Sequence, residues 1–219
     1  MTSEGRPPQA PIRWRLVLIQ ILLISLGVAV LAGAGKLVYG LWLTPKAPTS
    51  TGQALIGGPF QLVDTEGKPA DQRLLEGRWS AVFFGYSYCP DVCPATLTTL
   101  NAAKAKLGAK ADKLQVVFVS IDPERDTPAQ LKLYLDSPAF PKPIVGLTGT
   151  PEQIKAVARA YRVYYAKAEG TKPGDTAYLM DHASAIYLMN PKGQFGRLVD
   201  PQLPPDGMAK AIAEGMAGS

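Results

Sequence analysis

The pattern of apolar and polar positions begins with one long apolar segment. Residues 16–35 form a run of twenty residues without a charge, about the length that crosses the hydrocarbon core of a bilayer as a helix. Apolar residues continue beyond this run, and we therefore expect a transmembrane anchor over residues 16–43. A cleaved signal peptide is the alternative, but the apolar stretch is longer than the usual core of such a peptide.

The flanks of this segment predict its orientation. Three arginines lie in the tail that precedes it, residues 1–15, and the positive-inside rule places such a tail in the cytoplasm. A stretch rich in Thr, Pro, Ser and Gly follows over residues 44–54 and is typical of a tether. The remaining chain, residues 55–219, is then a domain in the periplasm of a single-pass protein of the cytoplasmic membrane.

Within this domain, short apolar runs alternate with amphipathic stretches. Strands are expected at about 60–63, 79–85, 115–121, 183–189 and 194–199, and helices at about 93–107, 128–136, 151–161 and 205–216. Thr127 and Thr150 each precede Pro and stand three positions before Gln, which predicts a capping box at two of the helix starts. Strands separated by helices indicate an α/β fold with a mostly parallel sheet covered on both faces.

Composition narrows the chemistry. Hydrophobic residues make up 47% of the chain and charged residues 19%, which excludes a disordered protein. The 23 basic and 18 acidic residues are spread out, so we expect no nucleic-acid partner. Two cysteines and one histidine cannot build a four-ligand Cys/His zinc site. Soft-metal or redox chemistry must therefore involve Cys89, Cys93 and His182.

The two cysteines lie where the strand at 79–85 leads into a helix. A helix N-terminus stabilises thiolate over thiol, and positions i and i+4 of a helix face the same way. Both sulfurs can thus reach one ion or each other. A structural disulfide is one alternative, although so small a loop restrains the unfolded chain little. Thiol exchange is another, but Cys89-x-x-x-Cys93 has one residue more than the Cys-x-x-Cys motif of thioredoxin-type oxidoreductases. These enzymes also usually carry a proline before a later strand, and none precedes the strand expected at 183–189.

His182 stands where thioredoxin-type oxidoreductases carry that proline, just before the strand expected at 183–189. By analogy with their layout, it should come to the same sheet edge as the cysteines. Two thiolates and one imidazole suit copper, because soft sulfur favours Cu(I) and imidazole serves either Cu(I) or Cu(II).

Three motifs in this order resemble the Sco/SenC family. They are FGYSYCPDVCPATL, VSIDPERDTP and the late Asp-His pair before a strand. The resemblance implies a thioredoxin-like fold, a central sheet flanked by helices, with an N-terminal transmembrane helix. It also implies a copper-binding protein that helps to assemble the binuclear copper centre of cytochrome c oxidase. The family's metal ligands fall on Cys89, Cys93 and His182.

The resemblance leaves the precise role open. The protein is expected to be a metallochaperone without turnover, serving the copper-binding subunit of the oxidase with a periplasmic copper donor and a thiol reductant as further partners. The alternative is a thiol–disulfide oxidoreductase whose redox-active pair, Cys89 and Cys93, keeps the subunit's cysteines reduced. A redox or copper sensor is a third option.

Several residues near the expected site are candidates for supporting roles. Asp122 and Asp126 follow a strand at the same edge and either shape their loop or tune the site. Asp181 is placed to orient the imidazole as a hydrogen-bond acceptor. Met180 and Met189 are soft ligands in principle, but their spacing along strands indicates core packing.

Overall fold

The computed structural model describes residues 12–38, 56–172 and 174–218. The chain divides into two units, residues 1–53 and 54–219. The predicted tether, residues 44–54, lies wholly outside the described residues. Most of the predicted cytoplasmic tail and the end of the predicted anchor, residues 39–43, lie outside them as well.

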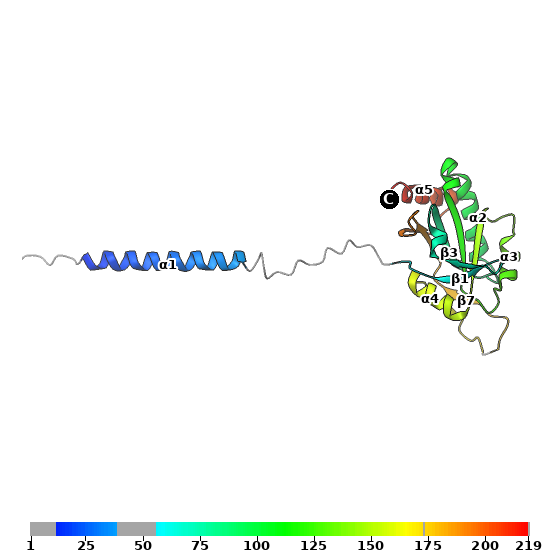
Figure 1. Ribbon diagram of the computed structural model, residues 1–219, viewed down its shortest axis with the longest axis horizontal. Helices are drawn as coiled ribbons and strands as arrows, with labels where there is room; N and C mark the ends of the chain where they lie inside the picture. The colour runs from blue at the N-terminus through cyan, green and yellow to red at the C-terminus, as the bar shows by residue number, and fades with distance from the viewer. Residues whose placement is uncertain (1–11, 39–55, 173, 219) are drawn as a thin grey trace, which may run out of the picture. The chain divides into compact units, whose positions relative to one another are not determined.

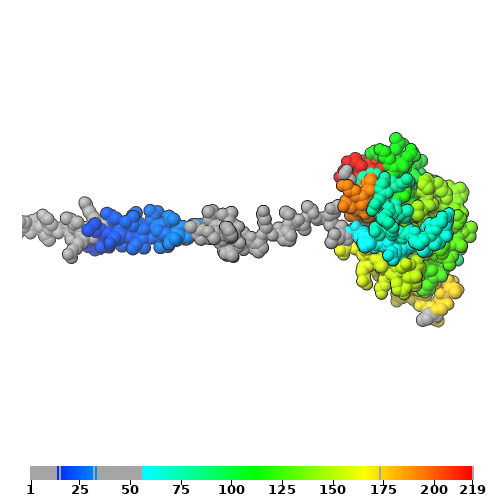
Figure 2. Space-filling view, viewed as in Figure 1, coloured from blue at the N-terminus to red at the C-terminus, as the bar shows by residue number. Residues whose placement is uncertain are grey.

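Among its described residues, the first unit contains one helix, α1 (Ile12–Val38). Its described side chains are all exposed, as the blue rod in Figure 2 shows. The longest continuous stretch of α1 whose side chains the structure describes is residues 16–31. In the part of the chain that the structure describes, no helix is long and apolar enough to cross a membrane.

A seven-stranded sheet forms the centre of the second unit (Figure 1). Its strands, in spatial order, are β2 (Pro69–Asp71), β1 (Gln61–Asp64), β5 (Ile144–Thr148), β4 (Leu114–Ser120), β3 (Trp79–Gly85), β8 (Ile186–Met189) and β9 (Phe195–Val199).

Only β3, β4 and β5 run parallel to one another, and the other pairs are antiparallel. The expectation of a mostly parallel sheet is therefore wrong, and the sheet is mixed. Two of these pairs, β1–β2 and β8–β9, are joined by tight turns, which connect only antiparallel strands, and each of these hairpins also meets the parallel strands in antiparallel orientation.

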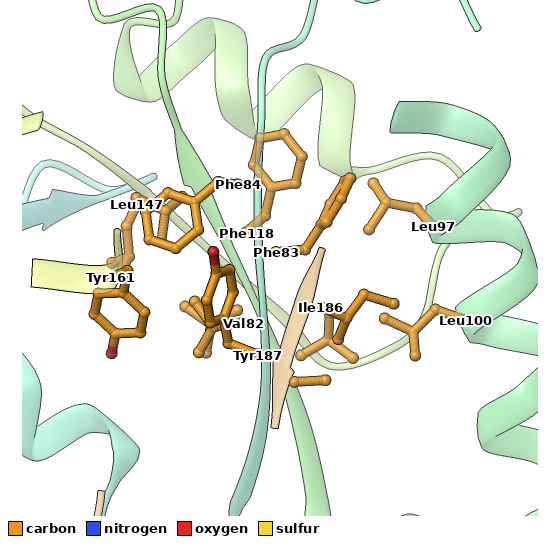
Figure 3. Packing of buried hydrophobic residues seen from close by; sticks show 14 of the residues in the cluster. Val82, Phe83, Phe84, Leu97, Leu100, Phe118, Leu147, Tyr161, Ile186 and Tyr187 are labelled. Carbon is orange, nitrogen blue, oxygen red and sulfur yellow. The ribbon is translucent and has the colours of Figure 1, made fainter. Parts of the chain in front are cut away.

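Helices cover both faces of this sheet. They are α2 (Val92–Ala105), α3 (Pro128–Leu135), α4 (Pro151–Tyr161) and α5 (Pro205–Gly215), and the described residues also form two short 3₁₀ helices, Gln72–Leu75 and Gly108–Lys113. Successive side chains of a strand point to opposite faces, and β3 separates the two layers of the core in this way. Phe83 lies beside Leu97 of α2, whereas Phe84 packs on Tyr161 of α4 with ring centroids 5.2 Å apart (Figure 3).

The predicted helix caps differ in how completely they form. At Thr150 both halves of the capping box are present. At Thr127 the hydroxyl accepts from the Gln130 amide, but the Gln130 side chain lies 3.5 Å from the Ser87 hydroxyl instead of returning to the cap. The competing contact lies in the loop between β3 and α2, residues 86–91, hereafter the cysteine loop. One half of that box is therefore replaced by a tertiary interaction.

A second, two-stranded sheet was not predicted. Strand β6 (Tyr165–Lys167) pairs antiparallel with β7 (Met180–His182) and is separate from the main sheet. The strand expected at 183–189 accordingly begins only at Ile186, because the chain leaves β7 before it enters β8. His182 thus lies at the end of this small hairpin.

Candidate metal centre

The cysteines lie at the junction of β3 and α2. Strand β3 ends at Gly85, Cys89 precedes the helix, and Cys93 lies in its first turn. Asp91 occupies the N-cap position, but its side chain makes no capping hydrogen bond. Instead, the backbone amide of Cys93 donates to the sulfur of Cys89 over 3.4 Å. The sulfur of Cys89 therefore acts as acceptor for the helix N-terminus, where negative charge is stabilised.

The two thiols differ in acidity. A hydrogen bond from Cys93 lowers the pKa of Cys89 to about 3, with further contributions from His182 and from the amides of Cys93 and Asp91. The same hydrogen bond, together with burial, raises the pKa of Cys93. Both cysteines are free. At neutral pH the pair therefore consists of a thiolate at Cys89 and a buried thiol at Cys93.

Gly85 makes room for the second cysteine. A Cβ atom at this position would lie 2.8 Å from the Cys93 sulfur and 3.0 Å from the ring of Phe118. The absence of a side chain lets the first turn of α2 approach the end of β3, which places a fully buried sulfur at the sheet edge.

His182 approaches the cysteines from the β6–β7 hairpin. Its Nε2 atom lies 3.9 Å from the Cys93 sulfur, and its Nδ1 atom lies 3.3 Å from the carbonyl oxygen of Ala183. Bonds of about 2.3 Å to sulfur and 2.0 Å to nitrogen, as at zinc, that meet at about 110–120° would put the two donors roughly 3.5–3.7 Å apart. The observed separation is close to that value.

The three side chains do not yet form a closed ligand set. Among the described residues, no group of three or more His, Cys, Asp and Glu side chains is arranged to hold a metal ion. The pairs Cys89–Cys93 and Cys93–His182 are each in contact. The imidazole must come closer to the two sulfurs before all three side chains can share one ion.

The site opens into a surface cleft of about 520 Å³. Cys89 and His182 line it, together with Tyr86, whose ring meets the imidazole edge-on at a centroid distance of 6.0 Å. Large exposed apolar side chains lie at or near this cleft, namely Tyr88, Val92, Tyr164 and Leu179. The cleft gives a ligand or partner direct access to Cys89.

The aspartates singled out from the sequence have different surroundings. Asp126 is buried and accepts hydrogen bonds from the amide and hydroxyl of Ser87 and from the hydroxyl of Ser120. Its pKa is raised by burial. Asp122 is also buried and forms an ion pair with Arg125. Both side chains therefore hold the loop after β4 against its neighbours.

Asp181 takes another position. Its side chain is exposed on β7, and the group beside the Nδ1 atom of His182 is the carbonyl oxygen of Ala183. Met180 and Met189 are buried in the apolar core, as their strand spacing predicted.

Two residues of the site's surroundings escaped the sequence analysis. The Arg125 guanidinium lies 3.6 Å from the ring centroid of Tyr178 and 4.8 Å from that of Tyr88. Arg125 belongs to the IDPERDTP motif, in which only the aspartates are predicted from the sequence to support the site. Tyr178 precedes β7 and carries no local pattern that would identify it.

The fold and the site together define a class of protein, a thioredoxin-like domain with a thiol pair and a histidine at the carboxyl edge of its sheet. The family model described as SCO1/SenC matches residues 48–217. The chain belongs to the SCO1/SenC family.

Individual relatives agree with this assignment. The chain is 43% identical to the mitochondrial protein SCO1 homolog 1 of Arabidopsis thaliana over 77% of its own length, but the match spans only 51% of that relative. It is also 43% identical to the protein SenC of Rhodobacter capsulatus, over 75% of this chain and 72% of SenC. A crystal structure of Arabidopsis thaliana ScoI with copper bound is similar in fold, with a TM-score of 0.66 and 39% identity over 73% of this chain and 97% of that one.

Proposed function

We propose that this protein binds copper through Cys89, Cys93 and His182 and supports copper insertion into the binuclear copper centre of cytochrome c oxidase. The observation that carries the proposal is the 3.9 Å separation between the Cys93 sulfur and the Nε2 atom of His182, at the mouth of a cleft that Cys89 lines. The copper-bound structure of the Arabidopsis relative supports the choice of metal.

The donor set fits copper in two oxidation states. Thiolates are soft ligands that favour Cu(I), and imidazole binds Cu(I) and Cu(II). Cys89, with its lowered pKa, offers a thiolate without loss of a proton at neutral pH. Cys93 must lose its proton on binding, so copper uptake releases protons. Bound copper would be the cargo that the protein delivers, and the cleft would expose it to the acceptor protein.

The partners follow from this role. The acceptor is the copper-binding subunit of the oxidase, and a periplasmic copper donor loads the site. A thiol reductant is needed as well, because an extracytoplasmic compartment favours disulfides and a disulfide cannot ligate copper. The chemistry of the free thiol pair supports the need for such a reductant.

We further propose that residues 16–43 anchor the protein in the cytoplasmic membrane, with residues 1–15 in the cytoplasm, residues 44–54 as a tether and residues 55–219 in the periplasm. The charge-free run at 16–35 and the three arginines before it support this arrangement. A reporter enzyme that is active only in the periplasm should be active when it is fused after residue 50. Activity of a cytoplasmic reporter there instead would contradict the orientation.

A thiol–disulfide oxidoreductase is the second candidate, and the split acidity of the cysteines favours it. A thiolate at Cys89 is ready to attack a disulfide, and the Cys93 thiol would resolve the mixed disulfide. In this role the protein would keep the oxidase subunit's copper-ligand cysteines reduced. A redox or copper sensor would use the same pair.

Copper titration of the reduced full-length protein separates these functions. Addition of Cu(I) and Cu(II) without oxygen should give a one-to-one complex, with thiolate-to-copper charge-transfer bands for Cu(II). Rapid general disulfide reduction without retention of copper would favour the oxidoreductase and would contradict the copper-carrier proposal.

A further inference from the structure

The two parts of the candidate centre come from elements that are not joined by a common sheet. The cysteines follow β3 of the main sheet, whereas His182 belongs to the separate β6–β7 hairpin. The distance between imidazole and sulfur therefore depends on how the hairpin docks onto the cysteine loop. One such contact is direct, because the amide of Met180 donates to the hydroxyl of Tyr86 over 3.2 Å.

The loop after β4 touches both parts. On one side, Asp126 accepts hydrogen bonds from Ser87 of the cysteine loop. On the other, Glu124 forms an ion pair of 2.7 Å with Lys167 of β6. Arg125 stands between these two contacts in the sequence, and its side chain reaches the two segments at once.

Arg125 contacts the segment that leads into β7. Its Nη1 atom donates to the carbonyl oxygen of Tyr178 over 2.8 Å, and its guanidinium lies 3.6 Å from the centroid of the Tyr178 ring. The hydroxyl of Tyr178 in turn donates to Asp122 over 2.7 Å, and Asp122 is the ion-pair partner of Arg125. These three side chains form one connected unit.

Arg125 contacts the cysteine loop through aromatic rings. Its guanidinium lies 4.8 Å from the ring centroid of Tyr88, which is adjacent to Cys89, and 5.8 Å from that of Tyr86. Within the described residues, its buried Nη2 atom has no hydrogen-bond partner. Stacking on tyrosine faces adds to the ion pair with Asp122 in compensating this cation, and a planar guanidinium suits such stacking better than an ammonium group.

We propose that Arg125 is a positioning residue that holds the β6–β7 hairpin against the cysteine loop and thereby sets the distance between His182 and the two sulfurs. One consequence of this positioning is that copper is held by three ligands rather than by the sulfurs alone, and this consequence rests on the proposed function. Its structural part, the docking of the hairpin, holds for the metal-free protein and can be tested there.

The first test measures docking without copper. The Met180 amide faces away from the hairpin toward Tyr86, so its hydrogen exchange reports separation of the two parts. In the reduced, metal-free full-length protein, Arg125→Lys should speed exchange at Met180 about tenfold, while Val117 and Val119 of β4 keep their protection. Lysine preserves the charge beside Asp122 but loses the planar stack and the geometry of the carbonyl contact.

Arg197→Lys is the matched control. Arg197 on β9 also donates to a backbone carbonyl, that of Ala211, and faces Glu214. The Arg197→Lys substitution should leave hydrogen exchange at the Met180 amide unchanged. Tyr178→Phe, which removes only the hydroxyl bonded to Asp122, should raise this exchange by a smaller factor, and it serves if Arg125→Lys does not fold. Unchanged exchange at Met180 in the folded variants, or an equal increase at Val117, would overturn the proposal.

The second test is a double-mutant cycle for Cu(II) affinity. If Arg125 acts by positioning the imidazole, His182→Ala should weaken Cu(II) binding less in the Arg125→Lys background than in the wild type, whereas Cu(I) binding changes little in either. Equal costs of His182→Ala in both backgrounds would contradict the proposed role. Failure of the wild-type protein to bind copper would refute the proposed function instead, and the exchange test would still decide whether Arg125 docks the hairpin.

Discussion

The two halves of the candidate metal centre are held in different ways. Cys93 is fully buried in the first turn of α2, directly against the end of β3 in the apolar core. His182 is half-buried on a hairpin outside the main sheet, which docks through polar and ring contacts to Tyr86, Glu124 and Arg125. The sulfur of Cys93 is thus fixed by the core, whereas the position of the imidazole depends on the contacts that dock the hairpin.

This difference has a consequence for copper chemistry. In the proposed site, the thiolates would hold Cu(I) and the imidazole would be engaged for Cu(II). Such a site would also let a partner protein loosen the imidazole while the sulfurs keep the metal. The substitutions below separate the contributions of the two halves.

The largest effect is expected on the thiol side. Cys89→Ser or Cys93→Ser removes a thiolate that either oxidation state needs, and copper affinity should fall by more than about 100-fold, which is beyond the usual effect of residues outside the ligand set. Titration with Cu(I) and Cu(II) under a competing chelator measures it. Retention of Cu(II) by either serine variant at wild-type affinity would show that the cysteines are not ligands.

On the hairpin side the loss should be selective. His182→Ala leaves two thiolates, which suffice for Cu(I), so Cu(I) affinity should change by less than about tenfold while Cu(II) affinity falls by about 100-fold. The same chelator competition gives both values. Unchanged Cu(II) binding would mean that another group completes the site.

A packing change tests how tightly the thiol side is fixed. Gly85→Ala places a methyl group 2.8 Å from the Cys93 sulfur and should lower the free energy of unfolding by about 1–3 kcal/mol, the usual cost of overpacking. Gly207→Ala in α5 is the control, since its Cβ would meet nothing nearer than 3.5 Å. Urea unfolding of both variants measures the difference in their free energies of unfolding. Equal values would show that α2 moves away from β3 at little energetic cost.

The smallest change is expected in the pH dependence of Cys89 alkylation. An ordinary cysteine loses thiolate about tenfold per pH unit below its pKa near 8.5. The pKa of Cys89 is lowered to about 3, so its thiolate persists as the pH falls and its labelling rate should stay nearly constant between pH 8 and pH 6. Mass spectrometry locates the label. A tenfold fall per pH unit from pH 8 would contradict the hydrogen-bonded thiolate.

The same division explains what the sequence predicts and what it does not. Strand β3 and helix α4 have the bounds expected from their apolar runs and caps, because local patterns determine them. The β6–β7 hairpin escaped prediction because its strands are only three residues long and are separated by residues 168–179. The role of Arg125 depends on tyrosines far away in the chain, which no spacing rule brings together.

The central claim is that free thiols at Cys89 and Cys93 bind copper together with His182, and its most direct test is copper loading before and after the thiols are oxidised. A sulfur in a disulfide cannot ligate the metal as a thiolate. The reduced full-length protein should take up one copper ion per chain, and the fully oxidised protein should take up none until a reductant is added. Equal copper loading of the reduced and oxidised proteins would contradict the account.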